Sequence, residues 1–203
     1  MIAGLAGFVG LVALLHVLRA DDLPPADHFI SEYARGDLGW VMAAAFGCWA
    51  VSLALLARGW RGVVRWALAV AAVGALGAGL FTTQTVAGMT PPGVERTFEG
   101  RAHDRATLLI FGGLLVAAVG SAVAVRRLRL PVALLALALL AVVPVLVALG
   151  LDAPGIGQRG FVLVGVAWQA LATREARATR AGPAAARGRR APPGRRARRG
   201  STS

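Results

Sequence analysis

The sequence has no lysine, a single cysteine and almost no charge inside its long apolar segments. A lone cysteine, Cys48, can form neither an intramolecular disulfide nor a thiol pair for a metal ion, and its apolar surroundings favour a small buried residue. With 57% hydrophobic and 16% charged residues, the 203-residue chain cannot cover its apolar surface as one soluble domain. The sequence therefore predicts an integral membrane protein.

Six apolar segments approach the length of about 20 residues that a helix needs to cross a hydrocarbon core about 30 Å thick. They cover residues 1–18, 39–57, 63–81, 106–125, 130–149 and 160–173. The first lacks the basic start and the cleavage site of a secretory signal, so we interpret it as a retained helix. The last is short and contains Gln169. We expect an all-α integral membrane bundle of about six transmembrane helices.

Residues 1–173 are thus predicted to form a six-helix transmembrane domain. Residues 174–203 contain arginine, alanine, glycine and proline but almost no apolar bulk, so we expect a disordered, Arg-rich cytoplasmic tail. Its default interpretation is a solvated segment that helps to set the topology. Contact with anionic inner-leaflet lipid is one alternative and nonspecific contact with RNA is another, whereas no specific nucleic-acid binding is expected.

Charge predicts the orientation of this domain. If all six helices span and the N-terminus is inside, 16 of the 22 arginines lie on the cytoplasmic side, ten of them from residue 174 onward. Nine of the ten acidic residues then lie on the outer side. We expect a multi-pass protein of the cell (plasma) membrane with both termini in the cytoplasm.

Two long outer segments, residues 19–38 and 82–105, carry most of the remaining polar residues. In the first, prolines precede and Gly36 follows residues 27–33, which is the pattern of a helix start and stop. We expect a short amphipathic helix on the outer surface or tucked against the bundle. Its predicted apolar face is Phe29, Ile30 and Tyr33, and its polar face is His28, Ser31, Glu32 and Arg35.

The candidate site lies on this outer face. It comprises His28, Ser31, Glu32, Tyr33, His103 and Asp104, with His16, Asp27 and Glu99 as secondary candidates. Imidazoles and carboxylates are ligands of zinc and other divalent metals, so a divalent metal is an open alternative, although no ligand set is assigned. Haem is not expected, because His16 has no histidine partner in another helix. The plainer interpretation is that the histidines bond neighbouring polar groups and pin the outer loops.

Two blocks carry a resemblance to a known family. Residues 28–33 are followed by Gly-Trp-Val-Met at residues 39–42, and residues 100–103 form a Gly-x-x-His element at the start of the fourth helix. These blocks resemble domain-of-unknown-function family 998, uncharacterised prokaryotic membrane proteins. Family members tend to end the third helix in Phe-Pro-x-Asp, where residues 81–84 read Phe-Thr-Thr-Gln. The resemblance covers residues 1–173, implies about six helices and brings no known activity with it.

The leading interpretation is a non-enzymatic membrane protein. Its outer cup, residues 19–38 and 82–105, is expected to bind a lipid head group or a small polar ligand, with membrane lipid as its partner. One alternative is a metal-dependent membrane hydrolase in which His28 and His103 hold an ion that activates a water. The other is a small-molecule transporter, for which Pro144 is the one obvious helix breaker.

Overall fold

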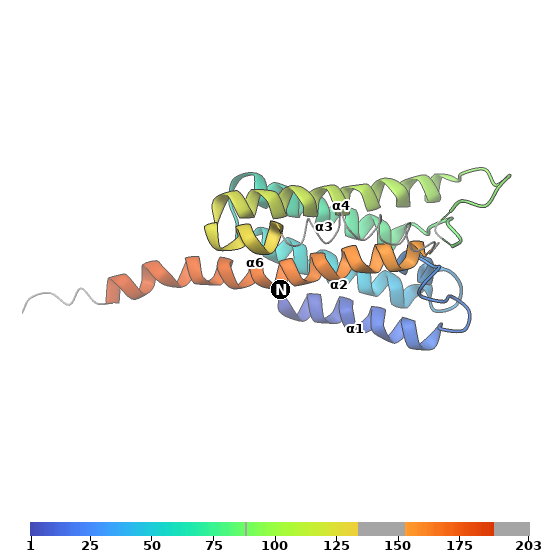
Figure 1. The fold of residues 1–203 in the computed structure, drawn as a ribbon, viewed down its shortest axis with the longest axis horizontal. Helices are drawn as coiled ribbons and strands as arrows, with labels where there is room; N and C mark the ends of the chain where they lie inside the picture. Colours follow the sequence, from blue (N-terminus) through green and yellow to red (C-terminus); the bar gives the residue numbers. More distant parts are fainter. Residues whose placement is uncertain (88, 134–152, 189–203) are drawn as a thin grey trace, which may run out of the picture.

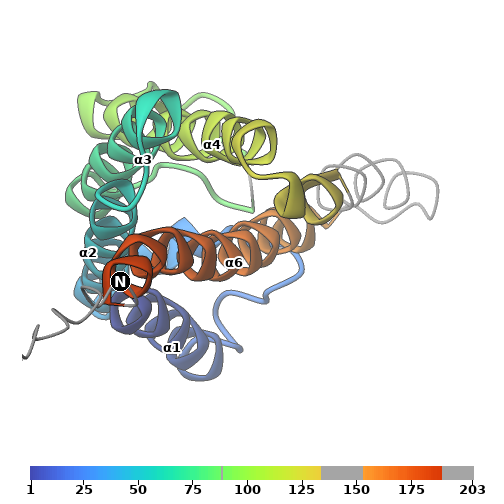
Figure 2. The same ribbon diagram turned by 90° about the vertical axis from the view of Figure 1, so that its left-hand side faces the viewer.

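The computed structural model describes residues 1–87, 89–133 and 153–188, with side chains described as far as residue 178. The regular elements of this part are helices. They are α1 (Ile2–Leu18), η1 (Ile30–Ala34), α2 (Gly39–Ala57), α3 (Gly62–Leu80), α4 (Phe98–Ala124), η2 (Arg126–Leu128) and α6 (Pro154–Gly188). The α-helices lie side by side along the long axis of the molecule (Figure 1). Viewed from the end, α1 to α4 form an arc, and α6 lies on its inner side in contact with α1, α2 and α4 (Figure 2).

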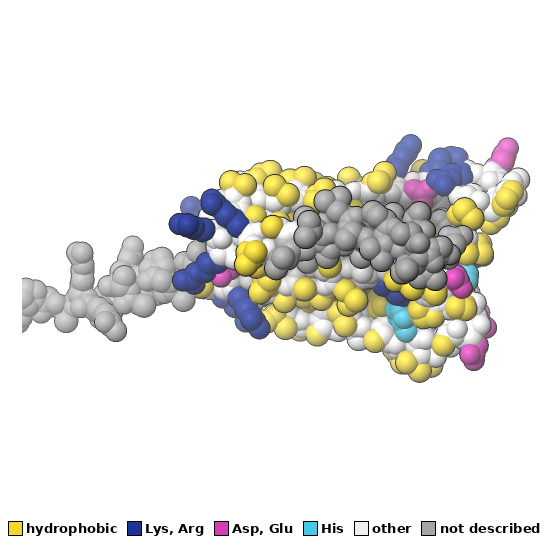
Figure 3. All heavy atoms as spheres, in the orientation of Figure 1, with side chains coloured by type: hydrophobic (Ala, Val, Ile, Leu, Met, Phe, Trp, Pro, Cys, Tyr) yellow, Lys and Arg dark blue, Asp and Glu magenta, His cyan; other side chains and the backbone are white. Residues whose placement is uncertain are grey.

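Three helices, α2, α3 and α4, are long and apolar enough to cross a membrane, and α1 is a shorter apolar helix. Their outward faces expose large apolar side chains, including Val51, Val73 and Leu115. Apolar side chains cover much of the middle of the visible face, whereas charged side chains gather at its two ends (Figure 3). A surface of this kind needs lipid as its solvent, so the chain is a helical membrane protein.

Glycines set the spacing between α3 and α4. A Cβ atom on Gly74 would lie 2.6 Å from the carbonyl oxygen of Ala106, and one on Gly113 would lie 2.7 Å from that of Ala67. Both distances are too short for real contacts, so glycine at these positions lets the two backbones touch.

Polar residues of α6 face the interior. Gln169 is buried, where its Oε1 accepts a hydrogen bond from Trp49 Nε1 at 3.3 Å and its Nε2 donates to the carbonyl of Gly165 at 3.2 Å. Trp168 Nε1 donates to Ser121 Oγ at 3.2 Å. The glutamine in the shortest predicted span thus pairs with α2 instead of facing lipid.

Two helices are longer than predicted. Helix α4 begins at Phe98, eight residues before the predicted span, because Thr97 Oγ1 caps it by accepting from the Gly100 amide at 3.2 Å. Helix α6 begins at Pro154 and continues to Gly188, so residues 174–188 are helical where we expected disorder. Alanine and arginine are strong helix formers, which explains the continuation. The rest of the tail, and residues 134–149 of the predicted fifth span with Pro144, lie outside the described residues.

The predicted amphipathic helix is the largest local correction. The chain forms a turn over residues 24–27 and then the short 3₁₀ helix η1. Residues 30–33 are all buried, so the expected polar face is wrong for Ser31 and Glu32. Gly36 follows with a φ of +77°, a conformation that favours glycine, and α2 begins three residues later. The element is therefore tucked into the bundle.

Candidate functional site

Glu32 is the polar centre of η1 and is fully buried. Its Oε2 lies 2.6 Å from His28 Nδ1 and accepts from the backbone N–H of Ala87 at 3.0 Å, while its Oε1 accepts from the N–H of Phe29 at 3.2 Å. Ala87 has a φ of +49°, which is unusual for alanine. The carboxylate thus connects residues 19–38 to residues 82–105. Its charge-assisted hydrogen bonds offset the cost of removing it from water.

Arg159 of α6 joins three elements. Its Nε donates to His16 Nε2 at 2.6 Å, and its Nη2 donates to the Tyr33 hydroxyl at 3.0 Å. Its Nη1 donates to the carbonyl oxygens of His28 at 2.5 Å and Gly155 at 3.1 Å. All four acceptors are neutral groups. We call Arg159, His16, His28, Glu32 and Tyr33 the Arg159 cluster.

The same contacts define the state of His16. Its Nδ1 lies 2.7 Å from the carbonyl oxygen of Val12, which can only accept, so Nδ1 carries the hydrogen. Its Nε2 accepts from Arg159, which requires a free lone pair on that nitrogen. The ring is therefore a neutral imidazole, and it packs edge-on against Tyr33 with 5.1 Å between ring centroids.

The first turn of α6 packs closely against residues 25–28. A Cβ atom on Gly155 would lie within 2.7 Å of three backbone carbonyl oxygens, those of residues 25, 26 and 28. Gln158 Oε1 accepts from the N–H of Ile30 at 2.6 Å. Glycine at position 155 thus allows the close approach that brings Arg159 to its partners.

His103 belongs to a separate network. It is 3% exposed, and its Nδ1 lies 2.8 Å from the carbonyl oxygen of Phe81 at the end of α3 (Gly62–Leu80). A Cβ atom on Gly100 would overlap the side-chain amide of Gln84, whose Oε1 accepts from the N–H of Thr97 at 2.8 Å. The Gly-x-x-His element therefore fastens residues 81–84 to α4, and Gln84 serves this packing.

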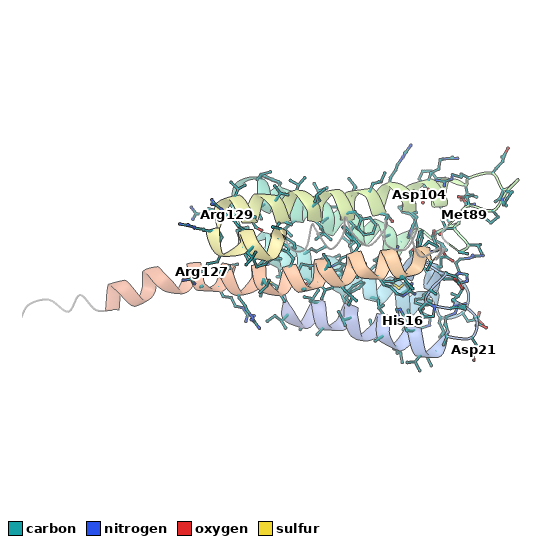
Figure 4. The ribbon with its side chains drawn as sticks, in the orientation of Figure 1. His16, Asp21, Met89, Asp104, Arg127 and Arg129 are labelled. Atoms are coloured by element: carbon teal, nitrogen blue, oxygen red, sulfur yellow. The ribbon has the colours of Figure 1, made fainter. Side chains whose placement is uncertain are left out.

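The remaining predicted site residues lie apart from these networks. Asp104 forms an ion pair with Arg96, and Asp27 and Glu99 are exposed. Ser31 lines a small void of about 20 Å³ together with Gln158 and Thr107. In the described part of the chain, no three His, Cys, Asp or Glu side chains form a group that could hold a metal ion. His16 and Asp104 lie at one end of the bundle, while Arg127 and Arg129 lie at the other (Figure 4).

Sequence reasoning missed Arg159, Gln158 and Gly155, which organise the site from α6. A weak signal existed, because Arg159 directly precedes an apolar segment at the same predicted membrane depth as His16. An arginine beside a membrane span needs a polar partner, and His16 at the same depth is a candidate for it.

Comparison with known proteins identifies the family. The profile of the family described as "Protein of unknown function (DUF998)" matches residues 1–175, from α1 to within α6. No curated protein and no solved structure matches the chain. The match confirms the resemblance carried by residues 28–42 and 81–103, since both blocks lie inside it. The chain is a helical membrane protein that belongs to the DUF998 family.

Proposed function

We propose that this membrane protein is non-enzymatic and binds a lipid head group or a small polar ligand at its loop end. The loop end is the end of the bundle that carries residues 19–38 and 82–105. The proposal also assigns six spans, with the loop end outside the cell and both termini in the cytoplasm.

The observation that carries the proposal is the charge balance of Arg159. Guanidinium keeps its positive charge at all relevant pH values, and the four acceptors around it are neutral. In the described part of the chain, the carboxylate nearest in the network, Glu32, is bonded to His28 and to backbone amides instead. These four bonds leave one Nη2 N–H of the half-buried guanidinium free to donate, and no described carboxylate forms an ion pair with it, so it attracts a phosphate or carboxylate oxygen.

Substitution of Arg159 tests the proposal. The probes are phosphatidylglycerol in nanodiscs, phosphatidylcholine as the uncharged comparison, and soluble glycerol phosphate. Arg159→Gln should weaken phosphatidylglycerol binding about tenfold or more, because a hydrogen bond to a charged group contributes about 1.5–3 kcal/mol. Arg159→Lys keeps the charge and should retain part of the binding. Arg105→Gln, which removes an exposed arginine at the same end, is the matched control.

Two results would contradict the proposal. One is a folded Arg159→Gln protein that binds phosphatidylglycerol and glycerol phosphate as the wild type does. The other is equal loss of binding in Arg105→Gln, which would mean that overall charge matters and not the cluster. Retained binding of glycerol phosphate alone would identify a small ligand instead of a lipid.

Topology has its own test. In a Cys48→Ala background, Asp21→Cys and Arg127→Cys each introduce a single thiol, and the two positions lie at opposite ends of the bundle (Figure 4). A membrane-impermeant maleimide added to intact cells should label the first variant only. Labelling of the second variant alone would invert the proposed orientation.

The structure gives the metal-dependent hydrolase less support. His28 pairs with Glu32 and His103 with Phe81, so the two histidines belong to different networks. Elemental analysis of the purified protein discriminates, since a stoichiometric metal that is lost with chelator would favour the hydrolase.

A further inference from the structure

A cavity of about 720 Å³ opens at the end of the bundle opposite to the Arg159 cluster. It lies between the turn that joins α2 to α3, the end of α4 and the side of α6. Its wall includes three arginines and one glutamate, Arg58, Arg61, Arg65 and Glu175. Its volume falls in the range of small-molecule sites, about 300–1,000 Å³, and its excess of positive charge suits an anion.

Trp60 supplies a donor without an acceptor. Its Nε1 is buried and has no hydrogen-bond partner in the described part of the chain, and its side chain lines the cavity. A buried N–H without an acceptor loses its hydrogen bond to water and gains none, so such groups are rare unless something else binds them. The Nε1 atom itself has almost no accessible surface, so an oxygen atom of an occupant would satisfy this donor once the indole ring turns toward the cavity.

An apolar groove continues from the cavity. It has a volume of about 400 Å³, lies between α2 and α3, and shares Arg58 and Arg65 with the cavity. Small side chains such as Ala54 and Ala69 form its floor, and Leu76 lies at its far end. From Arg65 to Leu76 the helix rises about 16 Å, which is about half of the hydrocarbon core and thus one leaflet.

Trp66 marks the level of this groove in the membrane. It lines the groove, is 68% exposed, and stacks with the Arg65 guanidinium 5.9 Å from its ring centroid. Tryptophan and arginine in this arrangement are typical of the boundary between head groups and acyl chains.

We infer that this cavity and groove bind one anionic phospholipid. The phosphate lies in the cavity among Arg61, Arg65 and the Trp60 N–H, and an acyl chain lies in the groove between α2 and α3. The basic cavity complements the negative charge of a phosphate, and the groove that continues from it is as long as one leaflet. Together these two features select an anionic phospholipid. The inference is independent of ligand binding at the loop end.

Native mass spectrometry of the full chain with added phosphatidylglycerol or phosphatidylcholine tests the inference. The wild type should retain one phosphatidylglycerol molecule, and Arg61→Gln should bind it about fivefold more weakly, which is the contribution of one basic residue near anionic lipid. Arg127→Gln removes another exposed arginine at the same end, outside the cavity, and should bind as the wild type does. Arg159→Gln should also leave this lipid in place.

Separate variants test the groove and the Trp60 N–H donor. Ala54→Phe fills the groove and should weaken binding, whereas Ala13→Phe places the same ring on an exposed part of α1 and should not. Trp60→Phe keeps the aromatic ring, removes the donor and should also weaken binding. Equal binding by Arg61→Gln and Arg127→Gln, or by Ala54→Phe and wild type, would overturn the inference. So would full displacement of the lipid by soluble glycerol phosphate, since the groove would then add nothing.

Discussion

Gly155 is the position where one methyl group should separate two parts of the structure. In Gly155→Ala the new Cβ would lie within 2.7 Å of three backbone carbonyl oxygens in residues 25–28. Backbone oxygens cannot swing aside as a flexible side chain can, so the first turn of α6 must move away from the loop. We therefore expect weaker bonds from Arg159 to the His28 carbonyl and from Ile30 N–H to Gln158.

The expected change in the free energy of unfolding combines two unfavourable contributions and one favourable contribution. Overpacking at a tight contact costs about 1–3 kcal/mol, and each weakened hydrogen bond adds about 0.5–1.5 kcal/mol. Alanine recovers up to about 1 kcal/mol of helix propensity relative to glycine. With two weakened bonds, the net loss is about 3 kcal/mol, which corresponds to a fall in Tm of about 6–12 °C for a chain of this size.

Gly160→Ala in the same helix is the matched control, because a Cβ atom on Gly160 would meet no other packed element within 4 Å in the described part of the chain. It should gain the helix-propensity term and raise Tm slightly. The assay is thermal unfolding of the full chain in nanodiscs, with hydrogen exchange at the Ile30 amide as a local readout. If Gly155→Ala raises Tm as much as Gly160→Ala and leaves the Ile30 amide protected, α6 does not dock on the loop as described.

Two further predictions concern the loop end. Glu32→Gln should lower the free energy of unfolding by about 2–3 kcal/mol, because the charge-assisted bonds to this buried side chain weaken, whereas Glu99→Gln at an exposed position should change it by less than about 0.5 kcal/mol in the same assay. Gly100→Ala should destabilise by pushing on the Gln84 side chain, and Gln84→Ala should remove most of that effect in the double variant. Additive losses in the double-mutant cycle would contradict the contact.

The sequence by itself determined the position of the first three helices of the membrane domain. The predicted spans 1–18, 39–57 and 63–81 agree with α1, α2 and α3 within one residue at each end. This succeeds because a helix in lipid satisfies its backbone internally, so apolar length alone marks it. The uneven distribution of charge was also visible, since it requires only counting along the chain.

Tertiary structure decided how the polar residues pair. Arg159 meets His16 across 143 positions, and Glu32 meets the Ala87 amide across 55. Such contacts depend on which faces of the helices pack together. In segments that are apolar all round, the helical periodicity of the sequence does not identify those faces. The same packing buried Glu32 in a short 3₁₀ turn, where its own amphipathic pattern predicted a solvated face. It also separated His28 from His103, because each histidine bonds a partner within its own loop network instead of a shared ligand.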